Sequence, residues 1–214
     1  MKPGIYASIG IVCRDHDGET VSEREEPAHS FTRNFGKGVY ASFLRSAVSG
    51  AYLDTSGSTV NAFIRHGYSG TFPEGYASGW LLHPAGEGIY RGIVVGSSGA
   101  GFDMGQYNLQ SPISHGVAAG NLQYAAQMYP SVVVAEDQSA ISLVLAREFG
   151  NASGSDVTIA EVGLIGYPPK TTSPSWDSYS PHTDVLLTRD VLDTPVVVPD
   201  GGVVGVSHIL RAVM

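Results

Sequence analysis

The sequence is poor in cysteine and has no long apolar run. Cys13 is the only cysteine among 214 residues, which excludes an internal disulfide, a CxxC redox pair and a thiolate-rich zinc site. We expect Cys13 to be a small core residue. No window reaches the roughly 18 consecutive apolar residues of a membrane-spanning helix, so no membrane association is expected. The apolar stretch at 5–13 lacks a cleavage site, which predicts an intracellular product without a signal peptide.

Charge is also scarce, and positive charge most of all. Charged residues make up 15% of the chain, with 12 Lys and Arg against 20 Asp and Glu and a net charge of −8. An average soluble domain has about 25%. This deficit argues against a disordered tail or a coiled coil. The acidic balance, without a basic tract, disfavours direct binding of nucleic acid.

Glycine and proline are plentiful, with 27 and 12 residues. Long helices tolerate neither well, so short strands joined by turns are favoured. We count eight to ten expected strands at regular spacing and no change in composition along the chain. The sequence therefore predicts one mainly β domain over 1–214, an antiparallel β-sandwich of jelly-roll type with a single helix in its N-terminal half.

The first half of the chain contains one hairpin and the only expected helix. Residues 5–13 run into Asp-His-Asp-Gly at 15–18, a tight-turn signal, and 19–26 form the returning strand. Apolar residues then recur at helical spacing over 31–48, with Ser30 as the expected N-cap and Gly50 as the stop. Residues 51–88 predict short strands and long loops.

The second half has clearer strand patterns. Alternation at 141–146 and at 157–165, separated by the turn residues 151–154, predicts an antiparallel hairpin. The Pro-Asp-Gly-Gly run at 199–202 predicts a turn. Further strands are expected at 89–95, 122–128, 132–136, 185–188, 196–198 and 203–213.

A 17-residue loop at 166–182 contains four prolines. Loops of this length are usually functional or mobile. This loop carries Tyr167, Trp176 and Tyr179, and aromatic residues are enriched in interface cores. We expect these side chains, with Tyr6 near the N-terminus, to contact neighbouring chains. A mobile surface loop is the alternative.

No motif for catalysis, cofactor binding or metal binding is found. The chain lacks GxxxxGK[ST] and GxSxG, and its seven histidines show no metal-ligand spacing. Asp15, Asp17 and Glu19 could offer oxygen ligands to calcium, but the later bidentate glutamate of an EF-hand is missing and a solvated hairpin is favoured. We expect no catalytic, cofactor or metal residues.

Charged residues within apolar strand segments need partners, because an isolated buried charge is costly. Arg189 and Asp190 lie together in one such segment, and Glu161 lies in another. Arg147 or Arg189 could pair with Glu161. A structural pair that braces a strand end is favoured over a contact with a partner protein.

From Arg91 onward the chain contains a series of short motifs in a fixed order: Gly-Ile-Val-Val-Gly at 92–96, Tyr-Asn-Leu at 107–109, Ile-Ser-His-Gly at 113–116, Gly-Asn-Leu-Gln-Tyr at 120–124, Arg-Glu-Phe at 147–149 with 151–154, Glu-Val-Gly-Leu at 161–164, 186–192 and 195–201. In these motifs the chain resembles a family of tailed-phage virion proteins. The resemblance covers about 124 of the 214 residues. The final strand departs from the family pattern, with Val-Ser-His-Ile at 206–209 in place of a Thr- and Tyr-rich segment.

The resemblance implies a non-enzymatic structural protein of the virion, assembled in the host cytoplasm. Capsid decoration (cement) or head–neck accessory protein is the expected role, in which the chain bridges shell subunits. Major capsid or other virion proteins would be its partners, and a homo-oligomer, preferably a trimer, its assembly state. A tail fibre, tail tip or receptor-binding protein is the first alternative, and a polysaccharide-degrading enzyme is the second.

Overall fold

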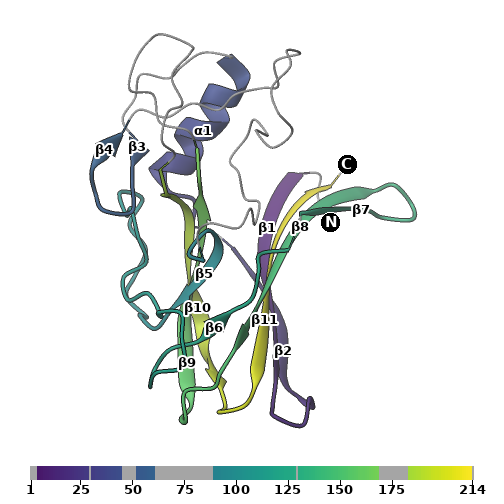
Figure 1. Cartoon of the computed structure of the whole chain (residues 1–214). Helices are drawn as coiled ribbons and strands as arrows, with labels where there is room; N and C mark the ends of the chain where they lie inside the picture. The colour runs from purple at the N-terminus through teal and green to yellow at the C-terminus, as the bar shows by residue number, and fades with distance from the viewer. Residues whose placement is uncertain are drawn as a thin grey trace, which may run out of the picture.

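Two antiparallel β-sheets face each other, and one helix lies at the upper end of the smaller sheet (Figure 1). The computed structural model describes residues 4–28, 30–44, 52–60, 89–128, 130–168 and 183–213. Within these ranges the chain is mainly β with the single helix α1 (Arg33–Leu44). The antiparallel sandwich predicted from the sequence is confirmed, and the jelly-roll connectivity remains a prediction.

The larger sheet, called sheet 1 here, has six strands. Its order is β2 (Thr20–Pro27), β1 (Gly4–Arg14), β11 (Val203–Val213), β8 (Ala140–Gly150) and β6 (Gln123–Tyr124), with β7 (Ser131–Val134) also paired to β8. Sheet 2 has three strands in the order β10 (Val185–Val198), β9 (Val157–Gly166) and β5 (Gly92–Gly96). A separate pair joins β3 (Tyr52–Leu53) and β4 (Thr59–Val60).

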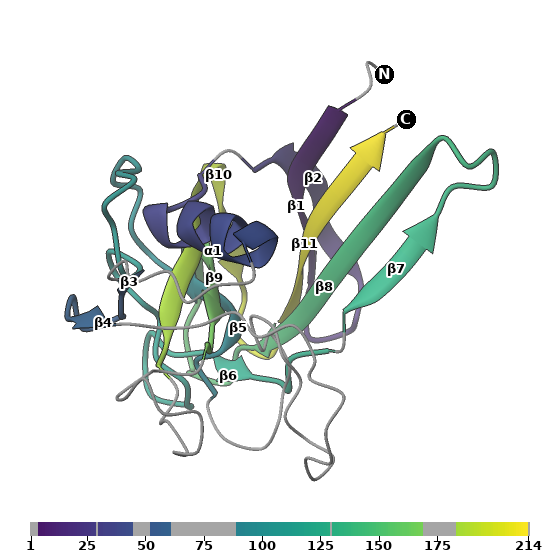
Figure 2. The same cartoon turned by 90° about the horizontal axis from the view of Figure 1, so that it is seen from above.

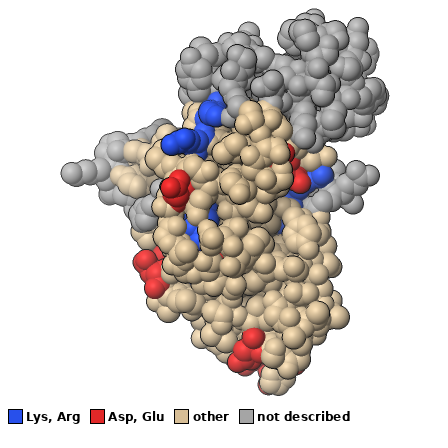
Figure 3. Space-filling view, turned by 90° about the vertical axis from the view of Figure 1, so that its left-hand side faces the viewer, with Lys and Arg blue, Asp and Glu red and all other residues tan. Residues whose placement is uncertain are grey.

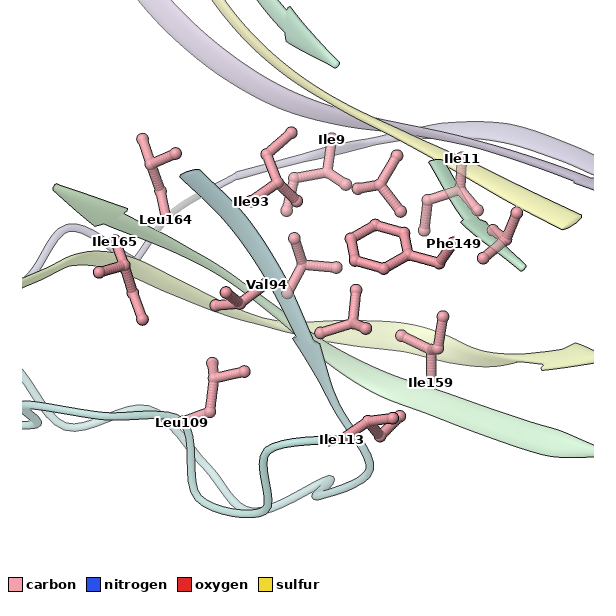
Figure 4. Packing of buried hydrophobic residues seen from close by; sticks show 14 of the residues in the cluster. Ile9, Ile11, Ile93, Val94, Leu109, Ile113, Phe149, Ile159, Leu164 and Ile165 are labelled. Carbon is pink, nitrogen blue, oxygen red and sulfur yellow. The ribbon is translucent and has the colours of Figure 1, made fainter. Parts of the chain in front are cut away.

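The hydrophobic core lies between the sheets and continues beyond sheet 2. Figure 4 shows Ile9 and Ile93 on one side of β5, and Leu109 and Ile113 on the other. The latter two belong to the long segment at 97–122 and are 5% exposed. This segment therefore covers the outer face of sheet 2, which explains why β9 is buried along nearly its whole length.

The first hairpin is confirmed. Strands β1 and β2 pair in antiparallel register, and Gly18 takes the positive φ of 83° that the turn requires. Alternate residues of β2 are exposed, as expected for a strand at the edge of a sandwich.

The predicted hairpin between 141–146 and 157–165 is wrong. Strand β8 belongs to sheet 1, whereas β9 pairs with β10 and β5 in sheet 2. The turn between them carries the chain across the sandwich. Residues 199–202 form the expected turn, but they also change sheets, from β10 to β11. A turn signal does not reveal whether the strands that it joins pair with each other.

Asn151 connects the two turns at which the chain passes from one sheet to the other. Its backbone exchanges hydrogen bonds with Gly201 and Gly202, both at 2.8 Å. Its side-chain amide donates to the carbonyl oxygens of Ser155 and Val198, also at 2.8 Å, and the residue is 2% exposed. The two corners of the sandwich are therefore held as one unit.

The predicted N-cap at Ser30 is also wrong, because the helix begins at Arg33. Residues 30–32 instead pair with the edge of β10, where Thr32 donates to Leu187 and Arg189 donates to Ser30. Gly50, the expected stop, lies outside the described residues.

Several predicted strands have different lengths in the structure. The segments predicted at 185–188 and 196–198 are parts of one bulged strand, β10, and the strand predicted at 122–128 shrinks to β6. The strand predicted at 89–95 begins at Gly92, and the described residues contain 11 strands, more than expected.

We predict that Asn151→Ala lowers the free energy of unfolding by roughly 1–3 kcal/mol, because it leaves the buried carbonyl group of Val198 without its donor. Urea unfolding measures the loss. Ser153→Ala is the matched control, because the Ser153 hydroxyl donates only within this turn, to Oδ1 of Asn151 and to the carbonyl oxygen of Ser155. This substitution should cost about 1 kcal/mol or less. Equal effects of the two variants would contradict the role given to Asn151.

Candidate functional site

A buried ion pair lies on the outer face of sheet 2. The Nε atom of Arg189 is 2.5 Å from Oε2 of Glu161, and both side chains are fully buried. Of the two partners that the sequence allowed for Glu161, the structure selects Arg189. The charges come from neighbouring strands, β10 and β9.

The segment at 97–122 is attached to this pair through its backbone. The Glu161 carboxylate accepts hydrogen bonds from the amides of Gln110 and Ser111, at 3.1 and 2.7 Å. The Arg189 guanidinium donates to the carbonyl oxygens of Ala100 and Gly101 and to the side chain of Gln106. Both charges are therefore hydrogen-bonded on several sides, the condition under which a buried pair is tolerated. The pair anchors the loop to the sheet.

Arg147 has a separate structural role. It donates to the backbone carbonyl oxygens of Ala125, Arg91 and Ile93 at 2.8–3.0 Å, and its guanidinium lies over the Tyr124 ring. No described carboxylate pairs with it. Burial lowers the pKa of Arg147 to about 10, although Tyr124 opposes this change. Arg147 ties β8 to the segments beside it.

A small cluster of polar side chains lies between the two sheets. His208 of β11 is 3% exposed, and its Nε2 atom lies 3.3 Å from the hydroxyl of Thr188 in β10. Burial lowers the pKa of His208, and the nearby Asp190 partly opposes this. Asp190 also accepts a hydrogen bond from the amide of Ser30 at 3.1 Å.

Two further candidates for chemistry are a buried thiol and an exposed acidic turn. Cys13 is fully buried in the core, as expected, and burial, followed by the charge of Asp15, raises the pKa of its thiol. Among the described residues, only Asp15, His16 and Asp17 cluster at metal-ligand distances. Asp15 already caps its own turn by accepting from two backbone amides. This cluster is a hairpin tip.

Sheet 1 extends past sheet 2, which leaves part of its core-facing side uncovered by the described residues. Seen from above, β1, β11, β8 and β7 diverge there from β9 and β10 (Figure 2). Cross-strand register places two rows of apolar residues on this side. We call these rows the apolar end of sheet 1: Ile5, Ala212, Ile141 and Val134, then Ala7, Leu210, Leu143 and Val132.

The apolar end of sheet 1 continues the core into solvent. The next row in the same register contains Ile9, His208 and Leu145, all buried. By contrast, Ile5 is 77% exposed, Val132 66% and Val134 53%. Ala7 and Leu143 of the second row are partly buried against the core. Exposed apolar surface of this kind marks interaction sites.

The structure places two of the four predicted interface residues. Tyr6 is 39% exposed, on the opposite face of β1 from Ile5. Tyr167 is half-buried beneath the Arg91 guanidinium, at 3.1 Å from its ring centroid. Trp176 and Tyr179 lie outside the described residues. Contact of these four residues with neighbouring chains stays a prediction.

Sequence reasoning missed the valines of β7. All residues of this strand are exposed, so its apolar side chains do not serve the core. The signal was a run of three valines, but such runs are typical of buried strands. Only the length of sheet 1 relative to sheet 2 reveals the difference.

A pocket of about 290 Å³ lies near the start of β9. It is lined by polar residues, among them Ser114, Asn121 and Asp156, and by the apolar Pro112, Ile113 and Val157. Elsewhere, charged side chains are few and scattered on the face shown in Figure 3.

No helix in the described ranges has the length and hydrophobicity needed to cross a membrane.

Comparison of the chain with protein-family models, with curated proteins and with solved structures finds no match. Function must therefore be inferred from the residues themselves.

We predict that Glu161→Leu alone lowers the free energy of unfolding by about 3–5 kcal/mol, because it leaves the Arg189 charge buried without its partner. The double variant Glu161→Leu with Arg189→Met removes both charges and should lose less than the single variant. Urea unfolding of the wild type, both single variants and the double variant measures the coupling. Additive losses would contradict an energetically coupled pair.

A second prediction concerns pH. Because the pKa of His208 is lowered in the folded state from 6.5, the unfolded state binds the proton more readily. The His208 contribution to stability is therefore complete above pH 6.5 and is lost as the pH falls below that value. Unfolding free energies measured at several pH values should fall less steeply for His208→Gln than for the wild type. Identical slopes would show that His208 does not contribute.

Proposed function

We propose that this protein is a non-enzymatic structural component of a tailed-phage virion. A capsid decoration (cement) or head–neck accessory protein that bridges neighbouring shell subunits is the favoured role. The resemblance of 91–214 to virion proteins supplies the setting. The apolar end of sheet 1 is the structural observation that supports an adhesive mechanism.

The proposed mechanism is burial of apolar surface. The apolar end of sheet 1 has two rows of four side chains each, so at strand spacing the surface measures roughly 19 Å along the rows and 14 Å across them. Covering these side chains with subunits of the shell removes apolar area from water, at about 25 cal/mol for each Å². The binding free energies of many such modest contacts would add up over the copies on one particle.

The rest of the fold suits a passive role. The charges of Glu161 and Arg189 are used to attach a loop, and Arg147 is held by backbone carbonyls. The partners in this proposal are the major capsid protein or other virion proteins, with the trimer favoured by the resemblance. Virions assembled in the host cytoplasm are the proposed location.

A tail receptor-binding protein is the second candidate. The pocket near Asp156 favours it, because the hydroxyl, amide and carboxylate groups of Ser114, Asn121 and Asp156 can hydrogen-bond a sugar. The aromatic platform typical of carbohydrate stacking is missing from the residues that line this pocket.

The test is to locate the chain in assembled virions and to alter the apolar end of sheet 1. Ile5→Lys combined with Ile141→Lys should reduce the copies of the protein per particle by about tenfold or more, because burying unpaired charge is costly. Quantitative mass spectrometry of purified particles measures the copy number. Circular dichroism checks that the β fold is retained.

Val21→Lys is the matched control. Val21 is a valine of β2 that is 54% exposed and lies away from the apolar end of sheet 1. It should leave the copy number unchanged. Wild-type protein that is absent from particles, or a lysine pair that incorporates as well as the wild type, would contradict the proposal.

A further inference from the structure

The two outer edges of sheet 1 differ in their protection against pairing with another strand. Strand β2 forms one edge, carries Glu23, Arg24, Glu25 and Glu26, and ends at Pro27. Charges and proline are the common means of keeping an edge strand from pairing. On the other side of the sheet, β7 reads Ser-Val-Val-Val, and no described strand pairs with its outer edge.

The backbone of β7 presents a regular set of free groups. Ala135 donates to Ala140 at the end of the β7–β8 pair, so Val133 and Ser131 also face β8 in the antiparallel alternation. Val132 and Val134 therefore direct their N–H and C=O groups away from the sheet. Their side chains lie in the two rows of the apolar end of sheet 1.

We propose that β7 pairs with β7 of a second copy of this chain, antiparallel and about a two-fold axis at Val133. In this register Val132 of one copy faces Val134 of the other, and the two pairs form four backbone hydrogen bonds. The Val133 side chains, 53% exposed on the opposite face, meet on the axis as a closely spaced pair. Isologous two-fold pairing is the commonest form of assembly.

The pattern of β7 fits a second copy because the arrangement is complementary to itself. Each apolar row of one copy runs into an apolar row of the other, since Val134 lies beside Val132 across the axis. The acidic turns at Glu136 and Asp137 go to opposite ends of the paired strands, roughly 20–25 Å apart, which exceeds the screening length of about 8 Å. No like charges meet at the joint.

The pairing deepens the proposed function, on which its biological use rests. It would join two apolar ends of sheet 1 into one band of eight strands, about 38 Å long at strand spacing, for contact with the shell. It yields a dimer, whereas the resemblance favours a trimer. The net charge of −8 on each copy should make association stronger as salt increases.

The test uses the self-contact of Val133. Val133→Lys and Val133→Glu each place two like charges opposite each other on the axis, so each variant alone should sediment as a monomer where the wild type is a dimer. An equimolar mixture should regain the dimer, because Lys then faces Glu. Val134→Pro, which removes an outward N–H but no bond to β8, should also weaken the dimer. Sedimentation velocity ultracentrifugation measures each state.

Circular dichroism of each variant checks folding, and Val21→Lys is again the matched control, expected to remain a dimer. A wild type that is monomeric at all concentrations, a trimer unaffected by Val133→Lys, or a mixture that stays monomeric would overturn the pairing. These results are separable from the virion test. Monomeric variants that still enter particles would leave the proposed function standing and show that pairing is not needed for it.

Discussion

The ion pair between Arg189 and Glu161 is the interaction on which the smaller half of the sandwich depends. Sheet 2 has three strands, and its outer face carries the buried ion pair. That face therefore needs a cover that excludes water. The segment at 97–122 is that cover, and the pair holds it by its backbone. Apolar contacts of Leu109 and Ile113 alone would set no register, whereas two amides and two carbonyls bound to fixed charges determine where the loop lies.

The apolar end of sheet 1 is exposed because the two sheets differ in their number of strands. Six strands pack against three, so the far end of sheet 1 has no described partner layer. Its side chains keep the alternation of a buried face although they are exposed, as Ile5 and Val132 show. Exposed apolar surface marks interaction sites, and this face is the observation from which the adhesive role is proposed.

Residue types predicted the buried charges of the candidate site, but they did not predict its exposed apolar surface. Glu161 and Arg189 were identifiable because charges are rare in apolar strands and must be paired, but the choice between Arg147 and Arg189 was open. That choice depends on which strands are neighbours. The exposed valines of β7 were unreadable for a similar reason, since exposure is a property of the layers around a strand and its own side chains do not specify it.

The sequence by itself determined the fold class of this protein, which is mainly β. Many glycines and prolines, alternating apolar residues and an Asp-Gly turn before Glu19 favour antiparallel strands over helices, because these preferences are local. The strands are longer than this pattern predicted, with 14 residues in β10. Only the tertiary structure decided that β8 and β9 lie in different sheets, and that residues 30–32 pair with the edge of β10 so that the helix begins at Arg33. Local patterns encode which face of a strand is apolar. They do not encode its neighbour, because pairing is chosen by the whole chain as it buries its apolar faces together.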